Sequence, residues 1–576
     1  MVTRRSPVAI SLLCLHAVLL AYSAWRHAPG YDEIGHLPAG LGIWQYGDFG
    51  LYRVNPPLVR CIATLPLALL DVETDYVQFA DTRSRPEFVM GARFWEHHGL
   101  RAYTYLSIAR FTAIGFSLLA GAAIYHWSRE LYGQRAGLFS LALWCFSPLV
   151  LANASMITPD VGACAMGTLT CFAFYRWLKE RTWDQTILTG LLLGAAELTK
   201  FTWVLLFPLL VLQFVGCEAV RRKTEFRSAL QLVTLFLIAV LVINVGYGFA
   251  GSFQRLGDYQ FVSETLRGSG DEGTNNRFAE SWLGAVPVPV PAEYVLGIDR
   301  QKLDFEGGFD SYLRGQWRDH GWWYYYLYGL AVKTPSGYLA IFALTAGTFL
   351  TTRASKAEVF LMSPAIAIMV LVSSQTGFSH HIRYVLPALP FVYVLAGRLL
   401  EASRHRYVRT AALVLLGGGI LPSLYVYPHS HAYFNLAAGG PAGGHKHLLE
   451  SNLDWGQDLL YLAEWNRRHG EIGLDGMAFR YNTLPLEDLG LPEALPPRKD
   501  QGPQPGWWAI SVQKLHSRDG AYAYFLNYEP VATIGYTTYI YHLTEEDISQ
   551  RRNSSSKDTR EAPNLRRHLP ASANVD

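Results

Sequence analysis

Charged residues are scarce in this chain: Asp, Glu, Lys and Arg make up 17% of its 576 residues, whereas hydrophobic residues make up 50%. A soluble chain of this length usually divides into several domains with more charge, so a soluble multidomain protein is disfavoured. The net charge of +2, without a basic run interleaved with aromatic residues, gives no sign of nucleic-acid binding. No Walker or Rossmann glycine motif is present, so a soluble nucleotide ligand is not indicated.

Cysteine is also scarce. The six cysteines form no CxxC pair and lie almost entirely in or beside apolar segments: Cys14, Cys61, Cys145, Cys164, Cys171 and Cys217. This pattern gives no disulfide framework.

The chain is rich instead in apolar blocks of about 15 to 22 residues, close to the length that crosses a bilayer. They predict an all-α polytopic membrane protein with eleven spans, over residues 7–25, 104–126, 136–152, 161–177, 186–198, 201–216, 229–249, 324–350, 357–374, 384–400 and 409–427. A cleaved signal peptide is the alternative for the first block, but its length and the lack of an A-x-A site favour a retained helix. The fifth and sixth blocks are interpreted as two helices that meet at Thr199-Lys200, with one long tilted helix as the alternative.

Basic residues sort the connections between these spans. Six basic groups fall on one side, which is then the cytoplasm: Arg4/Arg5, Arg129/Arg135, Arg176/Lys179/Arg181, Arg221/Arg222/Lys223/Arg227, Arg353/Lys356 and Arg404/Arg406/Arg409. The N-terminus is therefore expected in the cytoplasm and the C-terminus outside.

The membrane domain is predicted over residues 1–427, with outer loops at 26–103 and 250–323. Within the first loop, 35–47 and 57–70 are apolar enough for the membrane interface but too short to span. Residues 428–545 are predicted to form a small extracytoplasmic α/β domain, with a helix near 455–468 and strands at 507–513 and 536–543. The polar tail, 546–576, is predicted to be disordered.

Carboxylates stand at the outer ends of two spans. Asp32 and Glu33 follow the first span, where a carboxylate suits a general base but also suits a helix cap. Asp160, in Thr158-Pro159-Asp160, either supports a site or caps the helix that begins there.

Cations stand on the same face. Lys200 is predicted on the outer face, where the positive-inside rule expects few basic residues. It is therefore interpreted either as a phosphate-binding residue or as a side chain that snorkels to the interface. Arg383, in His380-His381-Ile382-Arg383-Tyr384, is a second phosphate candidate. The adjacent histidines invite a metal, but without a DxD or HExxH motif a divalent metal is not indicated, and no cofactor is predicted.

The rigid turn Asn55-Pro56-Pro57-Leu58 either directs Arg53, Asn55 or Arg60 into the site or is a plain interfacial turn. Carboxylates beside cations indicate a reaction in which a hydroxyl or amine attacks and an anionic group leaves. Asp32 would accept the nucleophile's proton, and Lys200 and Arg383 would stabilise a leaving phosphate.

These residues resemble the GT-C membrane glycosyltransferases, specifically the protein O-mannosyltransferase and aminoarabinose-transferase-like branch, over roughly residues 5–430. The motifs that carry the resemblance occur in order: Asp32-Glu33, Asn55-Pro56-Pro57-Leu58, Thr158-Pro159-Asp160, Leu198-Thr199-Lys200, residues 322–335 and Arg383-Tyr384-Val385-Leu386-Pro387. The resemblance implies inverting transfer of a sugar from a polyprenyl-phosphate donor to a lipid, glycan or protein acceptor. The reaction would take place on the outer face of a bacterial inner membrane.

The resemblance also implies roles for individual residues. Asp32 would be the base with Glu33 in support, Lys200 and Arg383 would bind the donor phosphate, and Tyr384 would line the site. Relatives often carry a basic residue or histidine where this chain has Asn55, so Arg53 or Arg60 would make that phosphate contact instead.

Two other classes of protein remain as alternatives. A transporter or lipid flippase predicts polar residues at mid-membrane depth and repeated halves, whereas the candidates here gather at one face and no internal repeat is visible. A membrane scaffold that binds a partner through residues 428–545 would leave Lys200 without a role.

Overall fold

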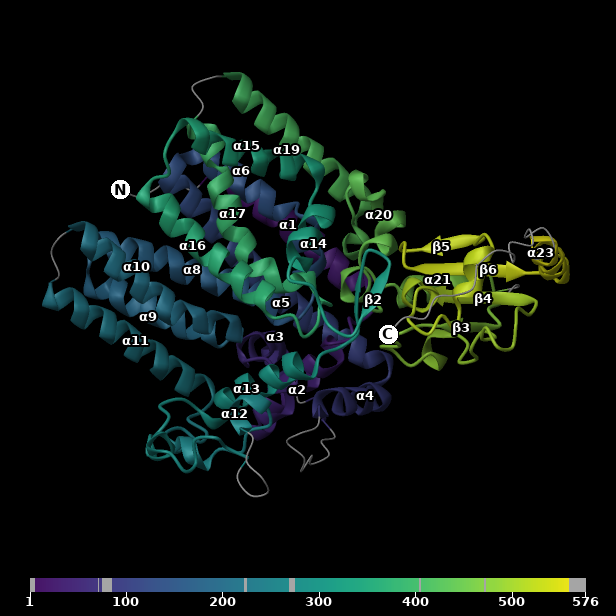
Figure 1. The fold of residues 1–576 in the computed structure, drawn as a ribbon, viewed down its shortest axis with the longest axis horizontal. Helices are drawn as coiled ribbons and strands as arrows, with labels where there is room; N and C mark the ends of the chain where they lie inside the picture. The colour runs from purple at the N-terminus through teal and green to yellow at the C-terminus, as the bar shows by residue number, and fades with distance from the viewer. Residues whose placement is uncertain are drawn as a thin grey trace, which may run out of the picture.

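The computed structural model describes residues 6–70, 72–74, 85–221, 225–268, 275–402, 406–470 and 473–558. A large helical body makes up most of the chain, and a small sheet lies beside it (Figure 1). The helices of the body are α1 (Pro7–Arg26), α2 (Glu33–Tyr46), α3 (Leu58–Ala68), α4 (Pro86–His98), α5 (Leu100–Tyr132), α6 (Gln134–Cys145), α7 (Pro148–Asn153), α8 (Pro159–Glu180), α9 (Trp183–Glu197), α10 (Leu206–Arg221), α11 (Phe226–Gly246), α12 (Glu264–Arg267), α13 (Ala292–Gly307), α14 (Tyr325–Lys333), α15 (Ser336–Thr351), α16 (Lys356–Ser374), α17 (Leu389–Ala396), α18 (Arg398–Ala402), α19 (Arg406–Val426) and α20 (Gly440–Gly443).

The strands form two small sheets. A hairpin of β1 (Ser311–Leu313) and β2 (Gln316–Arg318) lies within residues 250–323, the stretch predicted as the second outer loop. The four-stranded sheet has the order β3-β4-β6-β5, with β3 parallel to β4 and the other pairs antiparallel. Its strands and the helices around it are β3 (Gly476–Ala478), β4 (Gly506–Ser511), β5 (Ala532–Ile534), β6 (Thr538–Leu543), α21 (Leu459–Arg468), α22 (Val512–Leu515) and α23 (Glu545–Asp558).

The predicted fold class is confirmed, whereas the predicted spans need correction. Seven helices in the described part of the chain are long and apolar enough to cross a membrane, and they match seven of the eleven predicted spans. The predicted span 324–350 is instead a pair of helices, α14 and α15, bent by 118° at Thr334-Pro335. The stretches 136–152, 161–177 and 186–198 are helical but too short or too polar to pass the same test, and Phe146-Ser147 breaks the first of them.

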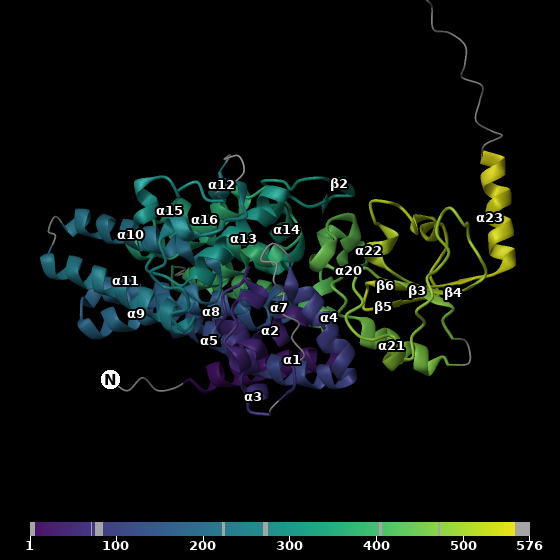
Figure 2. The same cartoon turned by 90° about the horizontal axis from the view of Figure 1, so that it is seen from below.

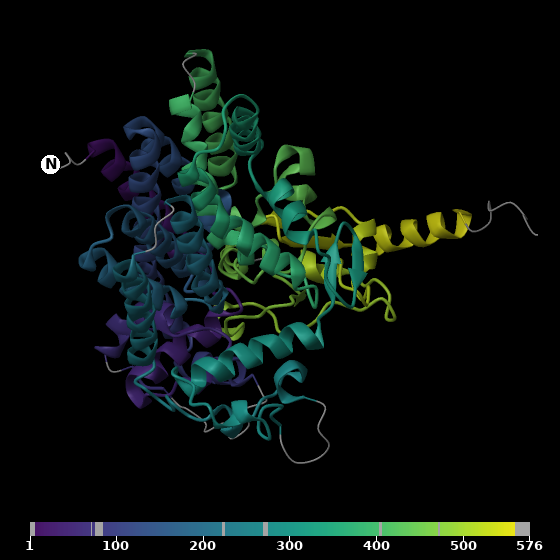
Figure 3. The same cartoon turned by 60° about the vertical axis from the view of Figure 1, so that its left-hand side comes forward.

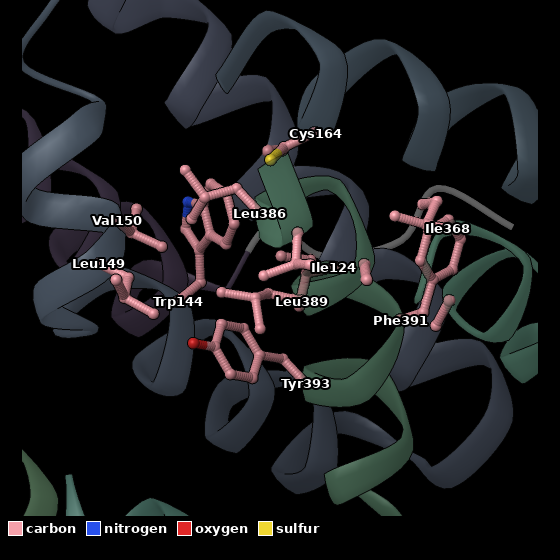
Figure 4. Close-up of a cluster of buried hydrophobic side chains, with 14 of the residues drawn as sticks. Ile124, Trp144, Leu149, Val150, Cys164, Ile368, Leu386, Leu389, Phe391 and Tyr393 are labelled. Carbon is pink, nitrogen blue, oxygen red and sulfur yellow. The ribbon is translucent and has the colours of Figure 1, made fainter. Parts of the chain in front are cut away.

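Helix α8 is less apolar than its neighbours because it lies inside the body, where small side chains allow close packing. A Cβ at Gly167 would lie 1.8 Å from the ring of Trp203, so only glycine admits this indole. The surrounding core includes Cys164 of α8 together with Trp144, Leu386 and Tyr393 (Figure 4).

The C-terminal part of the chain begins inside the helical body. Residues 430–458 run as short turns, and the sheet follows from β3 onward, beside the body and away from the N-terminus (Figure 2). The prediction of a disordered tail from residue 546 is wrong for its first part, because α23 covers Glu545–Asp558 and projects away from the sheet (Figure 3). Residues 559–576 lie outside the described residues.

Candidate active site

One polar cavity of about 430 Å³ gathers four charged residues that the sequence placed in separate motifs. Asp32 comes from the turn before α2, Asp160 from the start of α8, Lys200 from the turn after α9, and Arg383 from the 3-10 turn η5 (Ile382–Ala388). The lining also includes Tyr31, Tyr52, Asn55, Arg85, Phe88, Arg300, Asp304, His380, His381, Tyr384, Trp455 and Tyr481.

The four charged side chains form a chain of alternating sign. Asp32 Oδ2 lies 2.6 Å from Arg383 Nη2, Arg383 Nε lies 3.4 Å from Asp160 Oδ2, and Asp160 Oδ1 lies 2.6 Å from Lys200 Nζ. Three of these side chains are at most 7% exposed, whereas Asp32 is 21% exposed. Asp32 is therefore the carboxylate of this group that a molecule in the cavity can reach.

Arg383 has unused hydrogen-bonding capacity. Its Nη1 is buried and has no hydrogen-bond partner among the described residues. A buried guanidinium nitrogen without an acceptor is costly, so an anionic ligand would complete this site. The ring of Trp455 stacks on the guanidinium, with 4.0 Å from Cζ to the ring centroid, and fixes its orientation.

Asp32 occupies the N-cap position of α2, but its side chain makes no capping hydrogen bond and turns to Arg383 instead. Asp160 stands in the first turn of α8, after the N-cap residue Thr158, and bridges Lys200 and Arg383. The geometry therefore favours the site over the helix cap for both carboxylates.

Lys200 is held by a break between two helices. Helix α9 ends at Glu197, and Lys200 is extended before the turn η2 (Phe201–Leu205) leads into α10, so the predicted split of this region is confirmed. Trp203, seated against Gly167, donates from Nε1 to Ala163 O at 3.0 Å and anchors the turn. Lys200 Nζ then lies 4.6 Å from the centroid of the Tyr384 ring.

Glu33 points away from the cavity. Its carboxylate and Arg110 of α5 are both 0% exposed and form an ion pair, and the carboxylate also accepts hydrogen bonds from Gly30 N and Ile157 N. This arrangement ties α1, α5 and the start of α8 together behind Asp32. Sequence reasoning missed Arg110, although a lone arginine within a long apolar helix was a usable signal.

The Pro-Pro turn contributes only Asn55 to the cavity lining. Arg60 is buried in α3 and donates to Asn55 O at 2.7 Å, so it supports the turn from behind. Arg53 forms an ion pair with Glu293 of α13 at 2.6 Å. Neither arginine lines the cavity in this structure.

Aromatic side chains form a wall that the sequence did not reveal. Tyr31 lies between Phe88 and Tyr481, with ring centroids 4.8 and 4.9 Å away. Burial and the nearby Glu450 carboxylate raise the pKa of Tyr481 well above its ordinary value, so its hydroxyl stays protonated and donates to Glu450 at 2.7 Å. Such a wall suits the apolar faces of a sugar ring.

A second cavity of about 220 Å³ adjoins the first and shares Lys200, Gln301, Phe305 and Tyr384 with it. Its remaining lining comes from η2, α13, α14 and α16 and is mostly apolar: Phe201, Thr202, Val204, Ile298, Lys302, Tyr326, Leu371, Val372 and Gln375. Val204 and Leu371 are partly exposed on the helical surface, so the cavity lies beside the face that would meet lipid.

Comparison with known families gives one match. Residues 105–247, which extend from α5 to the end of α11, match the model of the family described as dolichyl-phosphate-mannose-protein mannosyltransferase. This segment is similar to protein mannosyltransferases. The match confirms the resemblance and the glycosyltransferase class predicted from the motifs. No curated protein sequence matches the chain.

Three solved structures are similar in fold. ArnT from Cupriavidus metallidurans in the apo state matches with a TM-score of 0.43 and 14% identity, over 92% of this chain and 97% of that chain. The same protein bound to undecaprenyl phosphate matches with a TM-score of 0.40 and 13% identity, over the same shares of the two chains. The Archaeoglobus fulgidus oligosaccharyltransferase tethered with an acceptor peptide matches with a TM-score of 0.43 and 13% identity, over 81% of this chain and 58% of that chain.

Proposed function

We propose that the protein transfers a sugar from a polyprenyl-phosphate carrier to an acceptor at the outer face of the membrane. The observation that carries this proposal is the junction of the two cavities. A polar cavity with an aromatic wall meets an apolar cavity at Lys200 and Tyr384. A lipid-linked sugar has the same order of parts, because its phosphate joins a polar ring to an apolar chain.

The phosphate would lie between Lys200 and Arg383, and the sugar would enter the polar cavity. Both cations are fixed by Asp160, so they are oriented before the donor binds. The unpartnered Nη1 of Arg383 provides a donor for a phosphate oxygen. The family model that matches residues 105–247 is named for a donor of the same chemical class.

Asp32 would act as the general base. The acceptor oxygen or nitrogen attacks the anomeric carbon while the bond from that carbon to the phosphate oxygen breaks, and the acceptor proton moves to the Asp32 carboxylate. The electron pair of the broken bond stays on the polyprenyl phosphate, beside Lys200 and Arg383. Direct displacement inverts the anomeric configuration.

The proposed orientation follows the basic residues and the position of the site. The end of α10 and the start of α11 lie at one end of the helical body, whereas α13, α4 and the sheet lie toward the other (Figure 1). If the basic end lies on the cytoplasmic side of a bacterial inner membrane, the cavity opens on the opposite, outer side. A lipid, glycan or protein acceptor would reach it there.

Transfer from a radiolabelled polyprenyl-phosphate sugar by the purified protein tests the proposal. Wild type and the control Asp48→Asn, an exposed aspartate in the same outer segment, should transfer label, whereas Asp32→Asn should fold normally and lose transfer. Label that accumulates inside proteoliposomes without leaving its carrier would contradict the proposal and support a flippase. Activity retained by Asp32→Asn would remove Asp32 as the base.

A further inference from the structure

Three potential metal ligands from distant parts of the chain meet beside the first membrane helix. His27 follows α1, His429 follows α19, and Asp458 immediately precedes α21. One ligand atom from each lies within 4.8 Å of those of the other two. The sequence gives no spacing motif for this group, because more than 400 residues separate His27 from the other two.

His27 has the hydrogen-bonding arrangement of a metal ligand. Its side chain is buried, and Nδ1 lies 3.0 Å from Ser23 O, an acceptor that places the ring proton on Nδ1. The lone pair is then on Nε2, which is buried and has no hydrogen-bond partner among the described residues. A histidine whose one nitrogen donates to a backbone carbonyl while the other is free is the usual state of a metal ligand.

Asp458 is held by the groups around it. Oδ1 lies 2.8 Å from His429 Nδ1, Oδ2 accepts from Thr537 Oγ1 at 2.7 Å, and the Gln457 amide lies 3.3 Å away. A Cβ at Gly535 would lie 2.2 Å from this carboxylate, so the glycine makes room for it. Gly535 and Thr537 lie in the turn between β5 and β6, which brings the sheet to the same point.

We infer that His27, His429 and Asp458 form a zinc-binding site that fastens the C-terminal part of the chain to the first membrane helix. Two imidazoles and one carboxylate are a common zinc ligand set, with water in the fourth position. Zinc bonds of 2.0–2.1 Å place tetrahedral ligand atoms about 3.3 Å apart, so the side chains, whose ligand atoms now lie within 4.8 Å of one another, would have to rotate to bind the ion.

The site would also order the catalytic cavity. Gln457 O accepts a hydrogen bond from Ala28 N at 3.0 Å, next to the proposed ligands His27 and Asp458. In the same turn, the Trp455 ring packs against Gly30 and covers Arg383. Zinc would hold this turn against α1. The ion would thereby position Trp455 over the Arg383 guanidinium without touching substrate itself.

Metal analysis of the full-length protein, purified in detergent with its affinity tag removed, tests this inference. Wild type should retain one zinc ion per chain after gel filtration, and a cobalt-substituted sample should show the visible absorption of a tetrahedral site. Zinc should fall to background in His27→Gln and Asp458→Asn. It should be unchanged in His469→Gln, an exposed histidine at the end of α21.

A second set of measurements separates a metal site from a simple histidine–aspartate ion pair. A chelator should lower the unfolding temperature of wild type, and added zinc should restore it. His429→Cys, which replaces one zinc ligand with another, should keep the metal. Wild type without zinc, without a cobalt spectrum and without a response to chelator would overturn the inference, as would full zinc in His27→Gln and Asp458→Asn. These readouts do not depend on transfer activity.

Discussion

Replacing Glu33 with glutamine should destabilise the protein rather than remove a catalytic group. The Glu33 carboxylate accepts hydrogen bonds from Arg110 and from the backbone N–H groups of Gly30 and Ile157, the last two at 2.8 and 2.9 Å. Glutamine keeps one acceptor oxygen but places an NH₂ group where the second oxygen accepts a bond. The Arg110 guanidinium then remains buried without its counter-charge.

The size of the effect follows from burial. Both side chains are 0% exposed, and neutralising one partner of such a pair costs about 3–5 kcal/mol because the other charge stays in a poorly solvating environment. Glu130→Gln is a matched control, because Glu130 pairs with Lys179 at the surface. Loss of an exposed pair costs about 0–1 kcal/mol.

Thermal unfolding in detergent and gel filtration measure the stability of Glu33→Gln, Glu130→Gln and Asp32→Asn, and the transfer assay follows on the folded fraction. Glu33→Gln should unfold at a clearly lower temperature yet retain transfer per folded molecule. Asp32→Asn should show the opposite pattern, because Arg383 keeps its pairing with Asp160. Wild-type stability together with lost transfer in Glu33→Gln would refute the structural role and assign chemistry to Glu33.

Three further substitutions probe the two cavities and the turn that covers them. Trp455→Ala removes the aromatic ring that stacks on the Arg383 guanidinium, a contact that contributes about 0.5–2 kcal/mol. The rate of transfer should therefore fall by about 2- to 30-fold. Unchanged kinetics would show that the ring does not orient the guanidinium. Leu371→Trp narrows the apolar cavity and should raise KM for a long polyprenyl donor but not for a short-chain analogue, whereas equal effects on both donors would count against a lipid groove. Burial raises the pKa of Asp454 from 3.8 to about 7, so the stability that this carboxyl contributes is present below pH 3.8 and is lost as the pH rises to about 7. Unfolding curves should therefore show Asp454→Asn to be more stable than wild type above pH 7 and to lose that advantage in acid, and a pH-independent difference would contradict this.

Sequence reasoning found the parts of the site that carry charge in an apolar setting. Asp32, Asp160, Lys200 and Arg383 each stand at the end of an apolar stretch, and a charge at such a place is costly enough to be a signal. Their meeting in one cavity followed from the predicted topology, because all four fall on the same face. The split at Thr199-Lys200 was needed for that topology, and the structure has it.

The sequence could not reveal contacts that depend on packing between distant segments. Trp455 lies 72 residues beyond Arg383 in a polar stretch, and nothing local indicates that it covers the guanidinium. Arg60 was placed in the site because it follows the Pro-Pro turn, but its position in α3 directs it to the back of that turn. Helix α8 was predicted as an ordinary span, since its small residues can be understood only once Trp203 is seen against Gly167.

The charge balance of the cavity gives a reason for the Asp32–Arg383 pair. Without a donor, two carboxylates, Asp32 and Asp160, neutralise two cations, Lys200 and Arg383. A phosphodiester donor adds one negative charge, and cleavage of its sugar bond gives a phosphate monoester with nearly two. If Asp32 accepts the acceptor's proton in the same step, the total charge of the buried site does not change; one negative charge moves from the carboxylate to the phosphate. Arg383 would then exchange the neutralised Asp32 for the more strongly charged phosphate, so the pair seen in this structure would hold the guanidinium ready for the leaving group.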